Sequence, residues 1–388
     1  MAPPFLPYGR QTIEDDDIAA VAAALRDDLL TTGPRVEAFE MAFADAVGAE
    51  HAVACANGTA ALHLTMLALG VREGDVCIVP STTFLATANC VRYVGAEVVF
   101  ADVDPDSGLM RPDDLAQALS EAGPKSVAAV LPVHMRGDVA DLPAIASLAE
   151  SAGAVVVEDA CHALGSALRH EGADALVGSG RWSSASTFSF HPVKTIATGE
   201  GGMITTPDAG LAERLRRLRS HGMVRPPGGD PWWYEMAEPG FNYRLPDILC
   251  ALGQAQLAKL PRFAAARRAL LARYLEALAS LAPAVRPAAS PPNSQATPHL
   301  MCVLIDFPAL GVTRREAMEA LKARGVGSQV HYIPVHSQPY YQARYGEKRL
   351  PGAEAWYDRT LSLPLYPGMD MADVDRVVSA LGEVLGLA

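Results

Sequence analysis

Residues 155–162, Val-Val-Val-Glu-Asp-Ala-Cys-His, read as an apolar strand that ends in an acidic residue and is followed by a histidine. Residues 189–203, Ser-Phe-His-Pro-Val-Lys-Thr-Ile-Ala-Thr-Gly-Glu-Gly-Gly-Met, place Lys194 between a β-rich run and a glycine-rich turn. A strand-end carboxylate and a loop lysine are the pair that a pyridoxal phosphate (PLP) enzyme needs. The lysine holds the aldehyde as a Schiff base, and the acid keeps the pyridinium nitrogen protonated. These two stretches therefore indicate both a fold class and a chemistry.

Around this segment, short apolar strands alternate with helices. Strands are expected near residues 52–56, 76–80, 97–103, 126–133, 154–158 and 184–190, and helices near 58–69, 83–94, 113–122 and 142–152. Strands that are apolar on both faces and separated by helices predict a buried, mostly parallel sheet, and hence an α/β fold.

The region before these strands and the region directly after them are expected to be mainly helical, and the C-terminal region is expected to contain both helices and strands. The pattern predicts helices within residues 12–48, a long helix over 246–278 bent near Pro261, and a connector at 283–298. The last 90 or so residues predict strands near 300–305 and 328–331 and helices near 314–324 and 371–384. We expect two domains, a large one over residues 1–250 and a small α+β one over 251–388. Residues 223–241 form a long loop with two tryptophans, which is more typical of a functional or partner-facing segment than of an inert one.

Composition limits the possible functions. The 388 residues carry a net charge of −12, which argues against nucleic acid as a principal partner because phosphate backbones need a basic surface. The six cysteines are scattered and include no Cys-x-x-Cys pair, which favours small buried side chains. No stretch approaches the roughly 20 apolar residues of a membrane span. We expect a reduced, cytoplasmic protein that binds neither a membrane nor a metal ion.

Candidate ligand residues fall where such sheets bind ligands, beyond the carboxyl ends of the strands. Gly58 and Thr59 open a helix and can bind a phosphate, although a plain strand-to-helix turn is the commoner explanation of such a pair. Phe84 can cover a ring face, although a lone phenylalanine usually belongs to the core. Asp159 and His162 each have an ordinary structural explanation too. Their occurrence together with Lys194, in chain order and at strand ends, favours a PLP site.

These motifs identify a family resemblance over nearly the whole chain. The chain resembles the sugar-nucleotide aminotransferases, PLP enzymes of the aspartate-aminotransferase fold. The matching segments lie at residues 7–11, 30–34, 57–62, 158–162, 189–194, 198–202, 240–247, 330–336 and 363–369. The resemblance implies a large domain with a mostly parallel seven-stranded sheet between helices, and a smaller α+β C-terminal domain. Residues 7–11 and 331–341 look most like the subgroup that serves the pseudaminic acid pathway.

The resemblance also implies residue roles. Lys194, Asp159 and His162 would be catalytic, with Lys194 as the Schiff-base lysine and Asp159 on the pyridine nitrogen. The cofactor would further contact Gly58, Thr59, Phe84, Ser189 and Asn242, the last from the other subunit of a homodimer with shared sites. The sugar nucleotide would contact Tyr8, Thr31, Arg225, His331 and Tyr332.

The implied reaction transfers an amino group from L-glutamate to a 4-keto-6-deoxy sugar nucleotide, with pyridoxamine phosphate as the intermediate cofactor form. A UDP-linked sugar for pseudaminic acid or a surface glycan is the expected product. Relatives that dehydrate sugars carry histidine in place of the lysine, so Lys194 favours amino transfer.

Several alternatives stay open. The substrate could be a GDP-perosamine precursor, a dTDP-linked sugar or a 3-keto sugar. An amino-acid aminotransferase or a decarboxylase could use Arg225 or Arg244 for a carboxylate. A non-catalytic regulator of the same fold is less favoured, and a metal site at His331 and His336 is weakly supported by its spacing.

Overall fold

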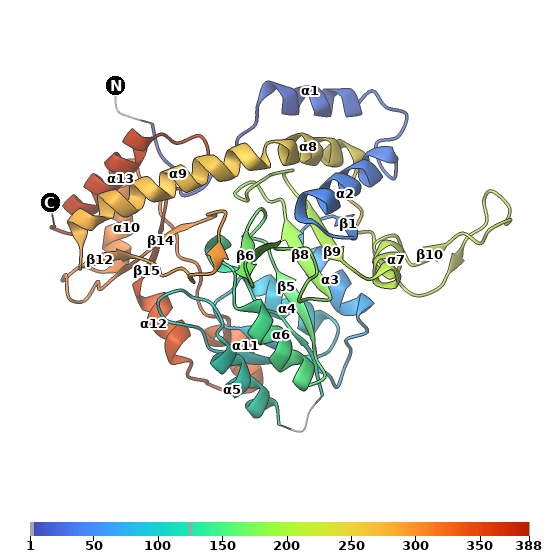
Figure 1. Cartoon of the computed structure of the whole chain (residues 1–388), viewed down its shortest axis with the longest axis horizontal. Coiled ribbons are helices and arrows are strands. Elements are labelled where there is room, and N and C mark those ends of the chain that lie inside the picture. The colour runs from blue at the N-terminus through green and yellow to red at the C-terminus, as the bar shows by residue number, and fades with distance from the viewer. Residues whose placement is uncertain (1–3, 124–125, 388) are drawn as a thin grey trace.

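The computed structural model describes residues 4–123 and 126–387, and a seven-stranded sheet lies at its centre (Figure 1). The strand order is β1-β9-β8-β5-β4-β2-β3. In that order the strands are His51–Cys55, Gly202–Thr206, Ala185–Ser189, Val155–Asp159, Val127–Val130, Val76–Pro80 and Glu97–Ala101. β9 runs antiparallel to both β1 and β8, and every other pair is parallel. The predicted mostly parallel α/β fold is confirmed.

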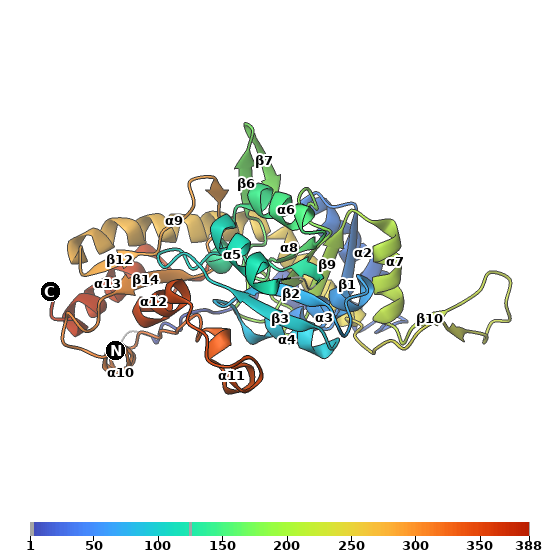
Figure 2. The same cartoon turned by 90° about the horizontal axis from the view of Figure 1, so that it is seen from below.

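Helices cover both faces of this sheet, which is why most residues of its strands are buried (Figure 2). On β2, Ile78 packs into the cluster that includes side chains of α5 (Pro112–Ala122) and α6 (Leu142–Ser151). Its neighbours Cys77 and Val79 point to the other face, into the cluster formed with α3 (Gly58–Ala68) and α4 (Leu85–Tyr93). This alternation fixes the register of the strand, because a shift by one residue would exchange the two faces.

The described part of the first 280 residues contains five further α-helices. They are α1 (Asp15–Ala24), α2 (Pro34–Val47), α7 (Ala209–Leu218), α8 (Asp247–Ala258) and α9 (Leu260–Leu278). The long helix predicted over 246–278 is therefore two helices, and they meet at Lys259 rather than bending at Pro261. Pro261 lies in the first turn of α9, where a helix does not need the missing N–H group.

A second, antiparallel sheet organises the C-terminal region. Its order is β12-β14-β15, with bounds Val285–Pro287, Met301–Ile305 and Thr360–Leu363. It packs in one core with α9, α10 (Arg314–Ala323) and α13 (Met371–Val384). The connector predicted at 283–298 contains β12 and the short β13 (Ser294–Gln295), the latter paired with the hairpin of β6 (Ala167–His170) and β7 (Ala173–Leu176). The division into domains at residue 250 stays a prediction.

The strand predicted at 328–331 was wrong, since only an isolated bridge joins Gln329 to Ser362. The backbone before it is already paired elsewhere: Gly327 N–H donates to Leu6 O at 2.7 Å, and Leu6 N–H donates to Gly325 O at 2.9 Å. The segment then turns toward the carboxyl ends of the central strands instead of extending the small sheet.

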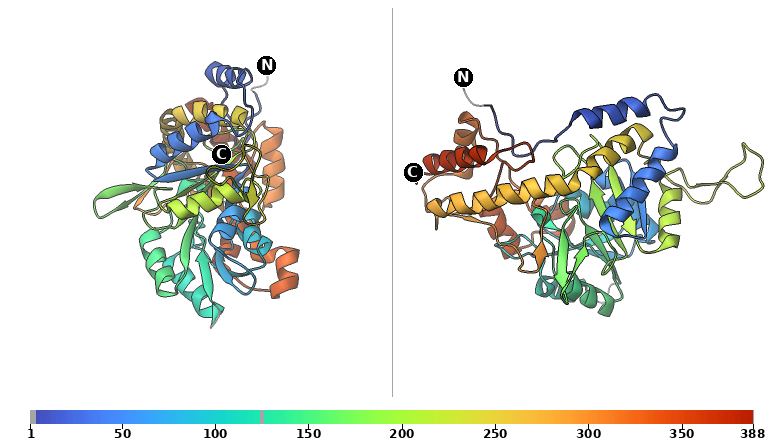
Figure 3. Two further views of the ribbon diagram at one scale, coloured as in Figure 1. Left: turned by 90° about the vertical axis from the view of Figure 1, so that its right-hand side faces the viewer. Right: turned by 45° about the horizontal axis from the view of Figure 1, so that its top comes forward.

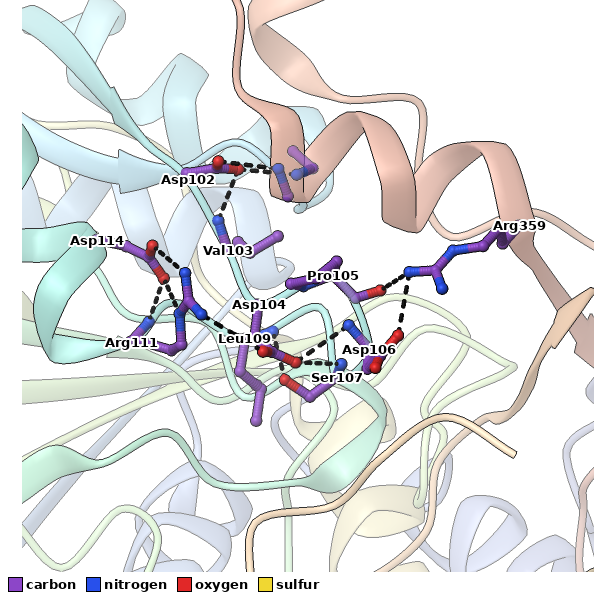
Figure 4. Close-up of polar contacts among 12 residues, drawn as sticks. Asp102, Val103, Asp104, Pro105, Asp106, Ser107, Leu109, Arg111, Asp114 and Arg359 are labelled. Atoms are coloured by element: carbon purple, nitrogen blue, oxygen red, sulfur yellow. Dashed lines mark hydrogen bonds and ion pairs between the residues drawn. The ribbon is translucent and has the colours of Figure 1, made fainter. Parts of the chain in front are cut away.

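Residues 102–107 join the central sheet to α12 (Pro351–Arg359), as Figure 4 shows. Asp102 caps this helix by accepting the backbone N–H groups of Gly352 and Ala353 at 2.9 and 2.8 Å. Arg359, in the last turn of α12, reaches Asp106 at 3.1 Å. The helix is therefore fixed at both ends to the loop that follows β3. The other C-terminal helix, α11 (Pro339–Tyr345), packs near the same edge of the sheet.

One hairpin projects away from the body of the molecule, and we call residues 222–241 the arm (Figures 1 and 3). It contains β10 (Met223–Val224) and β11 (Glu235–Met236), which pair antiparallel. Its tip exposes Trp232 and Trp233, with 72% and 52% of their surfaces accessible. In residues 4–123 and 126–387, no helix has both the length and the apolar character needed to cross a membrane.

Candidate active site

A cavity of about 690 Å³ lies at the carboxyl ends of the central strands. Ten of the thirteen predicted site residues line it: Tyr8, Gly58, Thr59, Phe84, Asp159, His162, Ser189, Lys194, His331 and Tyr332. They come from the N-terminal segment, from four strand ends and from the loop before α11. The parallel sheet brings them together because its strands end at one edge.

The first wall of the cavity is the start of α3. Asn57 caps this helix, accepting the Ala60 N–H at 2.8 Å. Gly58 and Thr59 follow as its first residues, and their N–H groups have no partner inside the helix. A Cβ atom on Gly58 would lie 2.8 Å from Ser189 Cβ, so only glycine lets the strand end and the helix approach this closely. The arrangement offers N–H groups and two hydroxyls to an anion.

Asp159 ends β5 and is held in one orientation. Its Oδ2 accepts a hydrogen bond from Thr87 Oγ1 at 2.6 Å, and its Oδ1 accepts the Cys161 N–H at 3.2 Å. Its backbone is fixed as well, since Asp159 N–H donates to Pro132 O at 2.9 Å. A buried carboxylate with only neutral donors around it suits a cationic ligand group.

Lys194 lies on the loop between β8 and β9 and reaches the same cavity. Its backbone N–H donates to His191 O at 2.8 Å, which closes a tight turn. Burial lowers the pKa of the Lys194 ammonium, although the neighbouring Cys161 and Asp159 oppose this effect. An amine with a lowered pKa is a better nucleophile and a better base near neutral pH.

The loop before α11 closes another side. Tyr332 Oη lies 3.1 Å from His162 Nε2, and the Tyr332 ring centroid lies 5.9 Å from that of Phe84. His331 Nδ1 lies 2.7 Å from Ser362 Oγ. Burial, together with the charge of Lys194, lowers the pKa of His331 to about 3. Burial raises the pKa of the Tyr332 hydroxyl well above its usual range, so this group stays protonated. The Tyr8 ring packs 5.5 Å from that of His331.

Three predicted residues lie outside this cavity of their own chain. Thr31 is an exposed residue of the segment between α1 and α2. Arg225 is exposed on the arm, and Asn242 is exposed just after it. Arg244, weighed as a carboxylate partner, does not line the cavity either.

Other lining residues were not predicted, among them Thr83, Glu200, His299, Gln329 and Gln338. Thr83 and Glu200 belong to segments already singled out, so position in the motif could have found them. Gln338 lies within residues 331–341 and Gln329 directly precedes residues 330–336, so position could have found these two as well. His299 reaches the site only through the packing of the C-terminal region, for which the sequence carries no local signal.

The residues of the cavity fit PLP. The start of α3 suits its phosphate, Asp159 suits its ring nitrogen, and Lys194 suits its aldehyde. His162 Nδ1 is buried and has no hydrogen-bond partner among the described residues, as in a site built to receive a polar ligand. His331 and His336 are instead paired with Ser362 and Ser81, and in the described part of the chain no group of three His, Cys, Asp or Glu side chains forms a metal site.

Comparison with known proteins supports the same assignment. Residues 11–382 match the sequence profile of the DegT/DnrJ/EryC1/StrS aminotransferase family. The fold is similar to that of Helicobacter pylori PseC, an aminotransferase of pseudaminic acid biosynthesis, with a TM-score of 0.89 and 27% identity over 98% of this chain and 99% of that one.

Two further structures show the range of similar proteins. DesI, solved in the presence of its TDP-sugar product, has a TM-score of 0.87 and 32% identity over 99% of this chain and 94% of that one. The sugar aminotransferase Spr1654 of Streptococcus pneumoniae, in its PLP form, has a TM-score of 0.88 and 26% identity over 100% of this chain and 99% of that one.

Proposed function

We propose a substrate and an assembly for this chain, which belongs to the DegT/DnrJ/EryC1/StrS aminotransferase family and is therefore a PLP-dependent sugar aminotransferase. The proposed reaction transfers the amino group of L-glutamate to a 4-keto-6-deoxy sugar nucleotide, with UDP as the nucleotide. The observation that carries the proposal is the placement of Lys194, Asp159 and the start of α3 around one cavity. The similarity to PseC supports the choice of sugar.

Lys194 is proposed to move the proton. When bound, the cofactor supplies an electron sink that stabilises negative charge at the substrate carbon. Lys194 Nζ, with its pKa lowered by burial, would take the proton from the α-carbon of glutamate and deliver it to C4′ of the cofactor. In the second half of the cycle the same Nζ works in reverse on the keto carbon of the sugar.

Asp159 and the residues around it are proposed to hold the ring in position. The Thr87 hydroxyl and the Cys161 N–H keep both carboxylate oxygens of Asp159 in fixed directions. Gly58, Thr59 and Ser189 bind the phosphate. Phe84 and Tyr332, in contact across the cavity mouth, limit the entry of water. A fixed geometry of this kind contributes several orders of magnitude to the rate.

The cavity also suggests that a second copy of the chain completes the site. Its described lining residues include no arginine, whereas both the donor carboxylates and the diphosphate of a sugar nucleotide are anions that arginine binds well. Arg225 and Asn242 lie on and beside the arm, exposed to solvent. We propose a homodimer in which these two residues reach the partner's cavity. The exposed aromatic side chains of the arm support this, because a patch of this kind is typical of an interface.

A panel of sugar nucleotides tests the substrate. Purified protein is incubated with L-glutamate and with UDP-, GDP- and dTDP-linked 3-keto or 4-keto sugars, and the product is identified by NMR. We expect a 4-amino product from the UDP-linked 4-keto-6-deoxy sugar. If only a dTDP-linked sugar is turned over, the proposal of UDP as the nucleotide is wrong. The similarity to DesI, which was solved with its TDP-sugar product, is the reason for including these sugars.

A further inference from the structure

His299 lies in the wall of the cavity and has no part in the roles proposed above. It is almost completely buried, and its Nδ1 has no hydrogen-bond partner among the described residues. Its ring centroid lies 4.4 Å from that of His162, with 43° between the two ring planes. The two imidazoles therefore form a close pair, although they lie far apart in the sequence.

The backbone of His299 is fixed on both sides. Its N–H donates to Arg136 O at 2.8 Å. Its carbonyl oxygen accepts a hydrogen bond from Arg267 Nη1 at 3.3 Å, and the same Nη1 donates to Leu365 O at 2.9 Å. Arg267 belongs to α9 and is buried, so the position of His299 follows from the packing of the C-terminal region against the central sheet.

We infer that His299 is a positioning residue that acts through His162. Its ring covers one face of His162, excludes water from that imidazole and holds it in the orientation in which Nε2 meets Tyr332 Oη. The catalytic consequence rests on the function proposed above, whereas the covering of His162 is a property of the protein alone.

Burial and, after it, the neighbouring charges disfavour a proton on either ring. Burial, then the charges of Lys194 and His331, lower the pKa of His162 well below its usual value. Burial, then His162, Lys194, Arg267 and His331, lower that of His299 in the same way. The Tyr332 hydroxyl stays protonated, and Asp159 lies three residues before His162 on the same strand end.

A neutral imidazole carries one N–H and one bare nitrogen. Because Nε2 of His162 is paired with Tyr332, its Nδ1 is left for a bound ligand. By keeping water away from His162, the His299 ring keeps this imidazole neutral. The Nδ1 edge, opposite the edge that meets Tyr332, then stays available to a bound ligand. Loss of the cover would admit water, and hydration would let His162 gain a proton.

The test compares two substitutions in the full-length, PLP-loaded protein. His299→Ala removes the cover, and His299→Phe keeps a flat ring without nitrogen atoms. Histidines are labelled with ¹³C at Cε1, and the His162 signal is assigned by its loss in His162→Gln. The chemical shift of His162 is then followed from pH 5 to pH 9, without substrate. The thermal midpoint of each variant shows that it is folded.

In the wild type we expect no titration of His162 in this range. In His299→Ala we expect His162 to titrate within this range, because hydration of the ring favours its protonated form. His299→Phe should restore the flat profile. The glutamate half-reaction adds a second readout. The rate constant at saturating glutamate should fall roughly tenfold in His299→Ala, the apparent Kd for glutamate should change less, and His299→Phe should recover most of the loss.

Two results would overturn the inference. A His162 signal that stays flat in His299→Ala would show that other residues keep the ring dry. A His162 signal that titrates in His299→Phe would show that the nitrogen atoms of His299 matter rather than its cover. Should His299→Ala not fold, His299→Asn, which also uncovers much of the ring, takes its place with the same expected direction. Because the titration needs no substrate, it stands even where the sugar assignment fails.

Discussion

At the scale of single residues, the site is built from side chains whose neighbours fix them tightly. Asp159 is held by Thr87 and Cys161, and Lys194 sits where burial lowers the pKa of its amine. The positions of both could be predicted from the sequence, because the end of β5 and the loop after β8 are marked by local features. That of His299 could not, because its place beside His162 depends on packing between distant segments.

Gly58 gives the sharpest steric prediction. Gly58→Ala places a Cβ atom 2.8 Å from Ser189 Cβ, so the start of α3 must shift away from the strand end. We expect a loss of roughly 1–3 kcal/mol in the free energy of unfolding and weaker PLP binding. Urea unfolding and fluorescence titration with PLP measure the two effects. Gly368→Ala, where the added Cβ meets nothing closer than 3.7 Å, is the control and should behave as wild type.

Glu158, next to Asp159, gives a prediction for pH. Burial alone would raise its pKa, but the hydrogen bond and charge of His134, with help from Ser183 and Ser186, lower it below the usual value. A lowered folded-state pKa stabilises the protein above the unfolded-state pKa of about 4.5, and this contribution is lost as the pH falls through the folded-state value.

Glu158→Gln should therefore destabilise the protein at pH 7, and the difference from wild type should shrink as the pH falls below about 4.5. Urea unfolding at pH 7 and at pH 3.5 measures it, with exposed Glu319→Gln as the control. A difference that is equal at both pH values would contradict the assigned role of the carboxylate.

At the scale of elements, α12 links the edge of the central sheet to the part of the cavity wall that contains His331. Asp102 caps its start, and Trp356 in its middle donates from Nε1 to His331 O at 2.8 Å. The approximate bounds of six of the seven central strands were predicted, since their apolar runs end at clear turns, but β9 and the order of the strands in the sheet were not. The bounds of α12 and the conformation of residues 328–331 could not be predicted, because contacts with the central sheet and with Leu6 determine them.

Asp102→Ala removes the cap of α12. We expect the free energy of unfolding to fall by about 1 kcal/mol and the KM for the sugar nucleotide to rise, since His331 loses part of its support. Urea unfolding and steady-state kinetics measure the two effects. Asp28→Ala, at an exposed position between α1 and α2, is the control. If stability falls but KM is unchanged, α12 does not support substrate binding through His331.

At the scale of the whole molecule, the arm and the missing arginine both point beyond one chain. The sequence predicted a partner-facing loop at 223–241 from its two tryptophans, and the structure shows that segment as a projecting hairpin. The sequence could not show which residues line the cavity of their own chain. Arg225 and Asn242 do not, and this is why we assign them to the partner's site.

Hybrid dimers test this assembly. Lys194→Ala chains and Asn242→Ala chains should each be nearly inactive alone. A mixed dimer carries one site with both substitutions and one site with neither, so we expect up to about a quarter of wild-type specific activity after equal mixing and exchange. Mixing Lys194→Ala with itself is the control. If the mixture is shown to contain hybrid dimers but regains no activity, Asn242 does not contribute to the partner's site.

The central claim is that the protein transfers an amino group from glutamate to a sugar through PLP, and that Lys194 moves the proton in each half of the reaction. The most direct measurement follows the absorbance of the bound cofactor in two steps. L-Glutamate should convert the cofactor to its pyridoxamine form, and a UDP-linked 4-keto-6-deoxy sugar should then restore the original spectrum. Lys194→Ala, folded as judged by its thermal midpoint, should do neither at a comparable rate, whereas exposed Lys322→Ala should do both. Normal conversion by Lys194→Ala would contradict the account.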